Sequence, residues 1–238
     1  MTRVDSPSQI AQRPPRKTQA ERRSTSERQI LEAAIRVIGR KGTVGLTLAE
    51  VGAKAGYSRG LAAHLFGNKE KLLLRVVETF IVTTRGQLVL PEFIEGGSLS
   101  ALIEALRQWI TVGVRRPQYY RTFEILTGEA ACEDVADISV KMRARIREIN
   151  RSVREQLARL LQQGQAAGEI RMEIDTDYTA LVILSTMRGL IAQWVLDPES
   201  VNLVSICNRF LQDLARELRP IRLRGATKQR ARKRAPNG

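Results

Sequence analysis

The sequence predicts an all-α protein, with a small N-terminal domain, a larger helical body and about nine helices. Apolar residues recur at helical spacing through most of the chain, and glycines and capping residues separate the periodic stretches. No stretch shows the alternation expected of a convincing strand. The length of 238 residues accommodates both domains, and an apolar content of 43% is sufficient for packed cores.

The net charge of +14 is concentrated at the two ends of the chain. The first 28 residues hold seven basic and three acidic residues, and the last 20 hold eight basic and no acidic residue. We therefore expect basic, disordered tails over 1–23 and 219–238, flanking a small domain at 24–67 and a larger one at 68–218. Such tails suit a polyanion such as DNA, RNA or an anionic membrane surface, although they could also only solubilise the chain.

Several classes of protein are excluded by what the sequence lacks. No apolar run approaches the roughly 18 residues of a membrane span, and no apolar segment follows the N-terminal arginines as in a secretory signal. The two cysteines, Cys132 and Cys207, fit a reducing cytoplasm. We expect two buried, unreactive thiols, with a regulatory disulfide as the alternative.

An enzyme is not predicted. The sequence contains no metal-ligand cluster, no Gly-rich phosphate loop after a strand, no GxSxG motif and no Cys–His pair placed for nucleophilic attack. His64 is the only histidine, so it cannot anchor a histidine-based metal site. We therefore expect no cofactor and no metal.

The first helix is expected to begin where capping residues precede an apolar face. Ser24 with Glu27, or Ser26 with Gln29, has the spacing of a capping box. Gly39 and Gly42 are expected to end the helix. Its apolar face comprises Ile30, Leu31, Ala34, Ile35, Val37 and Ile38.

Two short helices and the start of a fourth follow. Thr47 with Glu50 forms another capping box at the start of the second helix, and Gly56 ends that helix. Ser58 is placed to cap a third helix, which continues to about Phe66. After a glycine, Asn68 caps a fourth helix that is expected to end near Gly86.

The larger domain is predicted to contain five further helices. Residues 88–97 form a connection, Ser98 starts the fifth helix, and Pro117 suits the first turn of the sixth. A long seventh helix is expected from about Asp134 to about Gln163.

The last two helices are separated by an Asp-Pro break. The eighth is capped by Asp175 or Asp177 and is apolar nearly all round, which favours burial on more than one side. The ninth extends over about 200–218 and has a single apolar face.

The second and third helices have the properties of a helix-turn-helix unit. A recognition helix needs a brace across a short turn, one buried face and one bare face. Gly56 makes the turn, Ala62 and Phe66 form the inner face of the third helix, and Gly60 and His64 lie on its outer face. Small residues suit the helix crossing: Ala49, Gly52, Ala53 and Ala55.

Cations lie near both ends of the third helix. Arg59, in the first turn, could reach a guanine edge or a phosphate, and Lys69 begins the next helix, where backbone N–H groups also favour a phosphate. His64 is expected to face DNA, with packing inside the domain as the alternative.

This spacing resembles the N-terminal domain of TetR-type transcriptional regulators over about residues 26–85. The motif stands here as Thr47, Val51, Ala55-Gly56-Tyr57-Ser58, Gly60, Phe66, Lys69 and Leu72. The sequence departs from the family at Ala63 and Leu65, where aromatic residues or His are common. The resemblance and the spacing together suggest DNA contacts by Thr47, Ser58, Arg59, Gly60, Leu61, Ala63, His64, Asn68 and Lys69.

The resemblance also implies a homodimer in which the last two helices pack with their mates as a four-helix bundle. The all-round apolarity of the eighth helix supports a partner independently, although these residues could instead pack within one chain. The candidates are Leu184, Arg188, Ile191, Trp194, Phe210 and Leu214.

A small-molecule cavity in the body is likewise implied by the resemblance. Glu124 would suit a cationic effector, and Arg121 is a second possible polar anchor. Ordinary core packing is the alternative for each candidate: Trp109, Tyr119, Tyr120, Phe123, Glu124, Met142 and Met187.

The function expected from these observations is that of a cytoplasmic transcriptional regulator, most simply a repressor. It would bind a near-palindromic operator as a homodimer and be released by a small-molecule effector. The alternative is a nonspecific basic nucleic-acid-binding protein that depends on its tails. No membrane partner is expected.

Overall fold

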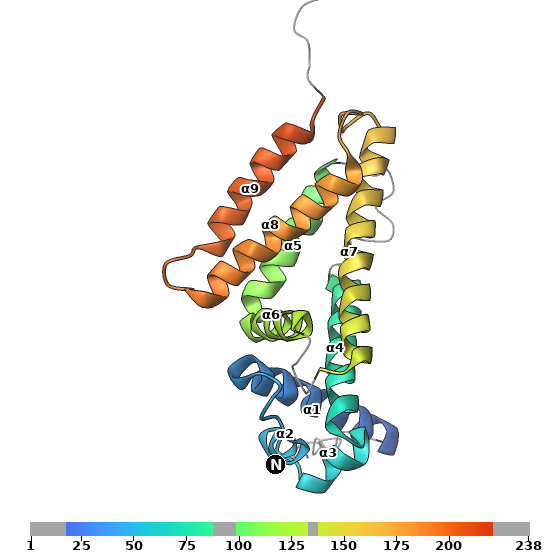
Figure 1. The fold of residues 1–238 in the computed structure, drawn as a ribbon, viewed down its shortest axis with the longest axis vertical. Helices are drawn as coiled ribbons and strands as arrows, with labels where there is room; N and C mark the ends of the chain where they lie inside the picture. The colour runs from blue at the N-terminus through green and yellow to red at the C-terminus, as the bar shows by residue number, and fades with distance from the viewer. Residues whose placement is uncertain (1–17, 88–98, 133–137, 221–238) are drawn as a thin grey trace, which may run out of the picture.

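A computed structural model describes residues 18–87, 99–132 and 138–220 (Figure 1). Within these ranges the chain forms α-helices and no strand, which confirms the predicted fold class. The helices are α1 (Gln19–Lys41), α2 (Leu48–Lys54), α3 (Arg59–Phe66), α4 (Lys69–Gln87), α5 (Leu99–Arg115), α6 (Pro117–Ala131), α7 (Val140–Ala166), α8 (Thr176–Leu196) and α9 (Leu203–Leu218).

The described helices form a small head and a longer body. Figure 1 shows α1, α2 and α3 at one end, with α4 extending from this head alongside α7. The helices α5 and α8 pack on the other end of α7, and α9 packs on α5 and α8. Helix α6 lies between the two parts and covers α1. The buried apolar side chains form two clusters.

The first cluster holds the head together, but it is not confined to the head. It contains buried residues of α1, α2, α3 and α4. It also contains Leu126 of α6 and Met142, Ile146 and Ile149 of α7, which are buried as well. The second cluster joins α5, the later half of α7, α8 and α9. The boundary predicted at 67/68 therefore falls within one continuous core, and it stays a prediction.

The first helix begins earlier than predicted. Thr18 is the N-cap: its hydroxyl accepts from Glu21 N, and the Glu21 carboxylate accepts from Thr18 N, which completes a capping box. The predicted start at Ser24 is wrong because Ser26 lies inside the helix, where its hydroxyl donates to Arg22 O at 2.9 Å. Residues 19–23, predicted as part of a disordered tail, are thus helical and Thr18 caps them, while the rest of that tail lies outside the described residues.

The predicted capping residues of α2, α3 and α4 occupy the cap positions, but they do not all make the expected hydrogen bonds. The Thr47 hydroxyl accepts from Glu50 N at 3.2 Å, but the Glu50 carboxylate pairs with Lys41 at 2.5 Å instead of closing a capping box. Ser58 occupies the N-cap of α3 without a side-chain hydrogen bond. Asn68 caps α4 by accepting from the backbone N–H of Lys71 at 2.9 Å.

The structure defines where the helices α7, α8 and α9 of the body begin. Ser139 caps α7 by accepting from Met142 N, so the start predicted near Asp134 is wrong; residues 133–137 and the predicted connection 88–97 lie outside the described residues. At α8, Asp175 is the cap, since its carboxylate accepts from two backbone N–H groups. Asn202 caps α9, which begins three residues later than about Ser200.

Side-chain hydrogen bonds tie the head to α6. The buried Thr122 hydroxyl donates to the carbonyl of Ile35 in α1 at 2.7 Å. Thr43, just after α1, donates to the Glu129 carboxylate from its hydroxyl at 2.6 Å and from its backbone N–H at 3.1 Å. Because buried polar groups are costly to leave unpaired, these bonds fix α1 against α6. Gly39 allows the close approach, since a Cβ there would lie 2.9 Å from the Thr122 hydroxyl oxygen.

The two cysteines differ, which contradicts the expectation of two buried thiols. Both are free, but Cys132 is exposed whereas Cys207 is 1% exposed in the second cluster, where burial raises its pKa to about 11. We expect a thiol reagent at neutral pH to modify one cysteine per native chain rapidly, and two after denaturation. Cys132→Ser should abolish the rapid reaction and Cys207→Ser should leave it intact; two rapid thiols in the native protein would contradict this assignment.

Candidate nucleic-acid interface

The head positions α3 by a close crossing with α2. A Cβ on Gly52 would meet Ser58 O at 3.1 Å and the Ala62 methyl at 3.5 Å, so the two helices approach at the limit that a glycine permits. Tyr57 N donates to Gly52 O at 2.9 Å across the turn. Gly56 makes the turn with φ of +79°, in the left-handed region that other residues adopt at a cost.

The two faces of α3 differ in the way the sequence suggests. Ala62 and Phe66 are buried against the head core, at 0% and 5% exposure. Gly60 and His64 are exposed, and nothing lies within 4 Å of the position that a Cβ on Gly60 would take. The outer face is therefore exposed and has no side chain at Gly60, which lets a recognition helix bring its backbone close to a duplex.

The remaining candidates for DNA contact surround this face. The side chains of Ser58, Arg59 and Ala63 are exposed at or along α3. Thr47 and Asn68 are also exposed, although each already caps a helix. Two candidates are less accessible, because they are partly buried: Leu61 and Lys69. The contacts of all these residues with DNA stay predictions.

The predicted ligand-binding residues are divided between the two cores. Tyr119 and Phe123 pack on Phe80, with ring centroids 5.8 and 5.6 Å away, in the first cluster. The Tyr120 hydroxyl donates to Trp109 O at 2.7 Å, in the second cluster. Two further candidates, both 0% exposed, belong to one cluster each: Met142 to the first and Met187 to the second.

Glu124 lies at a pocket, and Arg188 of α8 is its partner. Arg188 donates to Asn150 Oδ1 at 2.9 Å and to the Thr127 hydroxyl at 2.8 Å, and lies 3.6 Å from the Glu124 carboxylate. Its guanidinium carbon also lies 5.2 Å from the Phe123 ring centroid. Burial raises the pKa of Glu124, and attraction to Arg188 opposes that rise.

This pocket has a volume of about 320 Å³ and lies between α6, α7 and α8. Asn150 and Arg154 of α7 line it beside Glu124 and Arg188, with Leu181 and Leu184 as apolar walls. Periodicity assigned Arg188 to a dimer seam and gave no indication of Asn150 or Arg154. One signal was present in the sequence: Arg188 is the single charged residue within the apolar stretch of α8.

Three of the predicted dimer residues point into their own chain. Leu184, Ile191 and Leu214 are 6%, 1% and 8% exposed in the second cluster, so they are not available to a partner. Trp194 and Phe210 are partly buried against the same cluster. The apolar side chains that α8 and α9 expose are Tyr178, Leu181, Val182, Leu196, Val204 and Ile206.

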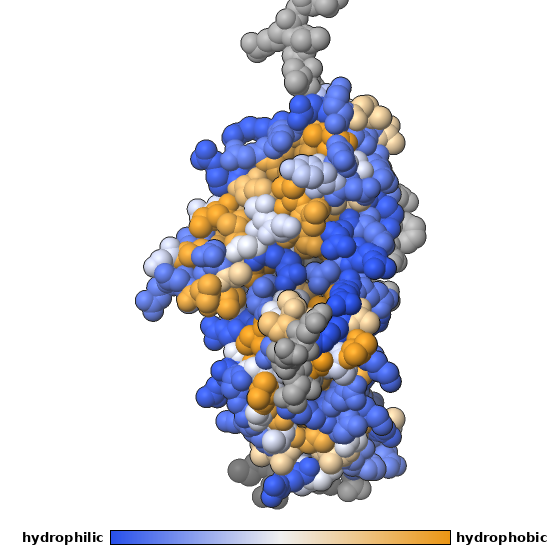
Figure 2. Space-filling model, in the orientation of Figure 1, coloured by the Kyte–Doolittle hydropathy of each residue, from blue (hydrophilic) through white to orange (hydrophobic). Residues whose placement is uncertain are grey.

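Apolar colour also gathers on the surface over α8 and α9, between more polar areas, as Figure 2 shows for the region where these helices lie in Figure 1. Among the described helices, α8 is long and apolar enough to cross a membrane, although a core helix can share that composition. Only 28% of its most apolar stretch is buried, so much of this helix lacks the cover that an apolar helix requires.

The fold and the bare outer face of α3 together define a helix-turn-helix DNA-binding protein with a helical body. Two family models match the chain: "Bacterial regulatory proteins, tetR family" at residues 30–76, and "Tetracyclin repressor-like, C-terminal domain" at 129–207. The chain belongs to the TetR family of transcriptional regulators. Members of this family regulate transcription and are not enzymes.

Individual relatives agree with this assignment. The transcriptional regulator TtgR of Pseudomonas putida is 27% identical over 192 residues, which cover 79% of this chain and 89% of TtgR. A regulator from Saccharomonospora viridis, solved with choline, is 19% identical with a TM-score of 0.69, covering 83% of this chain and all of that one. FadR from Bacillus subtilis, solved with stearoyl-CoA, is 21% identical with a TM-score of 0.64, covering 80% and 98%. At these identities the two structures establish the fold alone.

We expect Arg59→Ala to weaken binding to a specific operator by about 10- to 100-fold, because a bidentate contact to a base contributes about 1–3 kcal/mol of discrimination. Binding to random DNA should fall much less. Competition binding with both DNAs measures the difference, and Arg147→Ala, which removes an exposed arginine from α7, is the control. Equal losses on both DNAs would assign Arg59 to a phosphate.

Proposed function

We propose that the protein is a ligand-responsive repressor that binds a near-palindromic operator as a homodimer. The observation that carries the proposal is the exposed outer face of α3, which is free to enter a DNA groove. Helix α6 is hydrogen-bonded to the head and also lines a pocket in the body. Family membership supplies DNA binding and transcription regulation. Repression, dimerisation, effector release and a cytoplasmic location are the proposed additions.

The exposed apolar surface of α8 and α9 supports a second copy of the chain as the partner. A single recognition helix contacts few base pairs, and a two-fold dimer places two such helices one helical turn apart, about 34–36 Å. A two-fold axis beside α8 and α9 would cover Val182 and Ile206 with the same residues of the other copy. The second copy of the chain would also cover the part of α8 that is exposed in a single chain.

The position of α6 suggests how an effector would act. Glu124 of α6 lines the body pocket, whereas Thr122 and Glu129 of the same helix hold α1 and the loop that follows it. A ligand that pairs with Glu124 or Arg188 would displace α6 and, through these hydrogen bonds, the head. It would release DNA only by binding the DNA-free arrangement more tightly. The choline and stearoyl-CoA complexes of the similar structures support a small-molecule effector.

Selection of bound fragments from genomic DNA, followed by footprinting, tests the proposed operator. The expected result is a protected near-palindrome bound at least about 1,000-fold more tightly than random DNA at physiological salt. The alternative, a nonspecific basic nucleic-acid-binding protein, is favoured by the charge of the tails. Uniform binding to all sequences, with a steep dependence on salt, would support that alternative and reject the repressor.

Effector release is tested separately, on the operator found in this way. A compound library is screened by thermal shift, and hits are then tested for release of the operator. We expect Glu124→Gln and Arg188→Gln to alter the response to the effector while leaving operator affinity in its absence within a few fold. Hits that release DNA equally well from both variants would place the effector elsewhere.

A further inference from the structure

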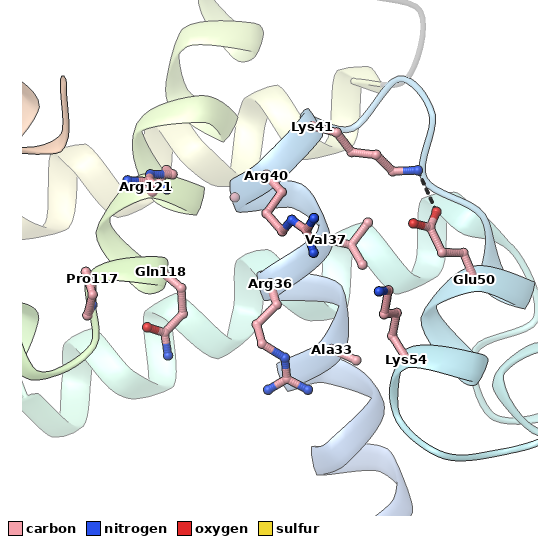
Figure 3. Close-up of a pocket in the computed structure, with 11 residues that line it drawn as sticks. Ala33, Arg36, Val37, Arg40, Lys41, Glu50, Lys54, Pro117, Gln118 and Arg121 are labelled. Carbon is pink, nitrogen blue, oxygen red and sulfur yellow. Dashed lines mark hydrogen bonds and ion pairs between the residues drawn. The ribbon is translucent and has the colours of Figure 1, made fainter.

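A second pocket lies where the head meets the body, and it is strongly basic. It has a volume of about 630 Å³ and opens between α1, α2 and α6 (Figure 3). Its charged lining residues come from all three helices: Arg36, Arg40, Lys41, Glu50, Lys54 and Arg121. Five of the six are basic, so the pocket carries a large excess of positive charge.

Most of this charge has no counterpart within the described part of the chain. Lys41 is paired with Glu50 at 2.5 Å. For the side chains of Arg36, Arg40, Lys54 and Arg121, in contrast, the described residues provide no ion-pair or hydrogen-bond partner. Some arginines elsewhere are paired, as on α4, where the Arg75 guanidinium contacts two carboxylates at 2.5 and 2.8 Å.

The arrangement also brings like charges together. Arg36 and Arg40 are four residues apart on α1, so their side chains lie on one face of that helix, where like charges destabilise it. Figure 3 shows Lys54 rising from α2 on the side of Arg40, with Arg121 on the neighbouring α6. A bound anion would remove this repulsion, and guanidinium groups suit phosphate because they can donate two parallel hydrogen bonds.

We propose that this pocket binds a small molecule with several phosphate groups. Its volume is within the range of about 300–1,000 Å³ typical of small-molecule sites. Operator DNA is a second source of phosphate, but the pocket adjoins α6, whereas α3 lies at the far end of the head from α6 (Figure 1). A compact phosphorylated ligand therefore fits the position better than a duplex held by α3.

Such a ligand would connect the head to the body. Arg36, Arg40 and Lys54 belong to the head, and Arg121 belongs to α6, one residue from the Thr122 that bonds α1. Binding would stabilise one orientation of the head on α6, and this regulatory consequence rests on the proposed function. Binding of the anion itself does not, so the two are measured separately.

Calorimetric titration of the full-length protein with inorganic tripolyphosphate, without DNA and at about 0.15 M ionic strength, tests the site. We expect saturable binding that Arg36→Gln/Arg40→Gln weakens at least tenfold and that Arg121→Gln weakens severalfold. The control is Arg147→Gln/Arg151→Gln, which removes an exposed arginine pair of the same spacing from α7 and should bind as the wild type does. Both double variants retain the basic tails, so anion binding by the tails is common to them.

Equal affinity in the pocket double variant and the control would overturn the proposal. Arg121→Gln gives a second, independent result, because it changes an exposed side chain on a different helix. Operator binding without tripolyphosphate distinguishes the source of the phosphate. We expect the pocket variant to keep the wild-type dependence on salt; a slope reduced by about 2 would assign the arginines to DNA phosphates and overturn a small-molecule site.

Discussion

Val182→Glu/Ile206→Glu is expected to convert the protein to a monomer and to weaken operator binding by about 100-fold or more. Both side chains are exposed, one on α8 and one on α9, at 39% and 41%. In a two-fold interface each carboxylate would be introduced twice into apolar surroundings, where an unpaired charge is costly. The loss of DNA binding follows because linked heads benefit from a high effective concentration, which raises affinity by about 100- to 10,000-fold over one head.

Light scattering measures the oligomeric state, and operator titration measures the loss. The control variant, Val140→Glu/Met172→Glu, adds the same charge at apolar residues that are more exposed, 82% and 71%, and that lie outside α8 and α9. It should stay dimeric and bind the operator normally. A wild-type protein that is monomeric at micromolar concentration would contradict the proposed interface, as would a fully dimeric Val182→Glu/Ile206→Glu variant.

Gly113→Ala is expected to lower the free energy of unfolding by about 2–4 kcal/mol, at or above the usual cost of overpacking. A Cβ on Gly113 in α5 would lie 1.8 Å from two ring carbons of Tyr120 in α6, a distance that no small adjustment relieves. The ring cannot easily retreat, since its hydroxyl donates to Trp109 O at 2.7 Å and the ring makes a T-shaped contact with Trp194 at a centroid distance of 6.4 Å.

Chemical denaturation of two alanine variants separates this clash from the general effect of replacing a helical glycine. A Cβ on Gly128 of α6 would have no neighbouring atom within 4 Å, so Gly128→Ala should stabilise the helix by about 0.5–1 kcal/mol. Opposite signs for Gly113→Ala and Gly128→Ala are expected. A destabilisation of the same size in both would attribute the effect to something other than the contact with Tyr120.

The helix-turn-helix unit could be predicted because its determinants are local. Gly56, Ala62 and Phe66 lie within eleven consecutive residues, and their spacing alone defines the turn and the buried face of α3. The start of α1 could not be located by periodicity because Ala20 is the only apolar residue in its first two turns, although Thr18 and Glu21 have the capping spacing. Capping and periodicity in the sequence thus locate the helix-turn-helix unit but not the full length of α1.

The body pocket could not be predicted in the same way. Arg188 meets Asn150 and Thr127, which are 38 and 61 residues away in the chain, so only the packing of α6, α7 and α8 brings them together. The dimer candidates show a related limit. An apolar helix exposes some of its apolar residues and buries others, and periodicity could not distinguish the buried Ile191 from the exposed Val182.

The shared core between head and body has a consequence for engineering chimeric regulators. Leu126, Met142 and Ile146 complete the interior of the head, so a head excised after Gln87 would lose part of its own hydrophobic interior. Grafting this head onto a foreign body would require transplanting the matching surfaces of α6 and α7 with it. The part of the chain needed for a stable DNA-binding head is therefore larger than the part that contacts DNA. Substitutions on the surfaces of α6 and α7 that face the head will determine which heads a given body can support.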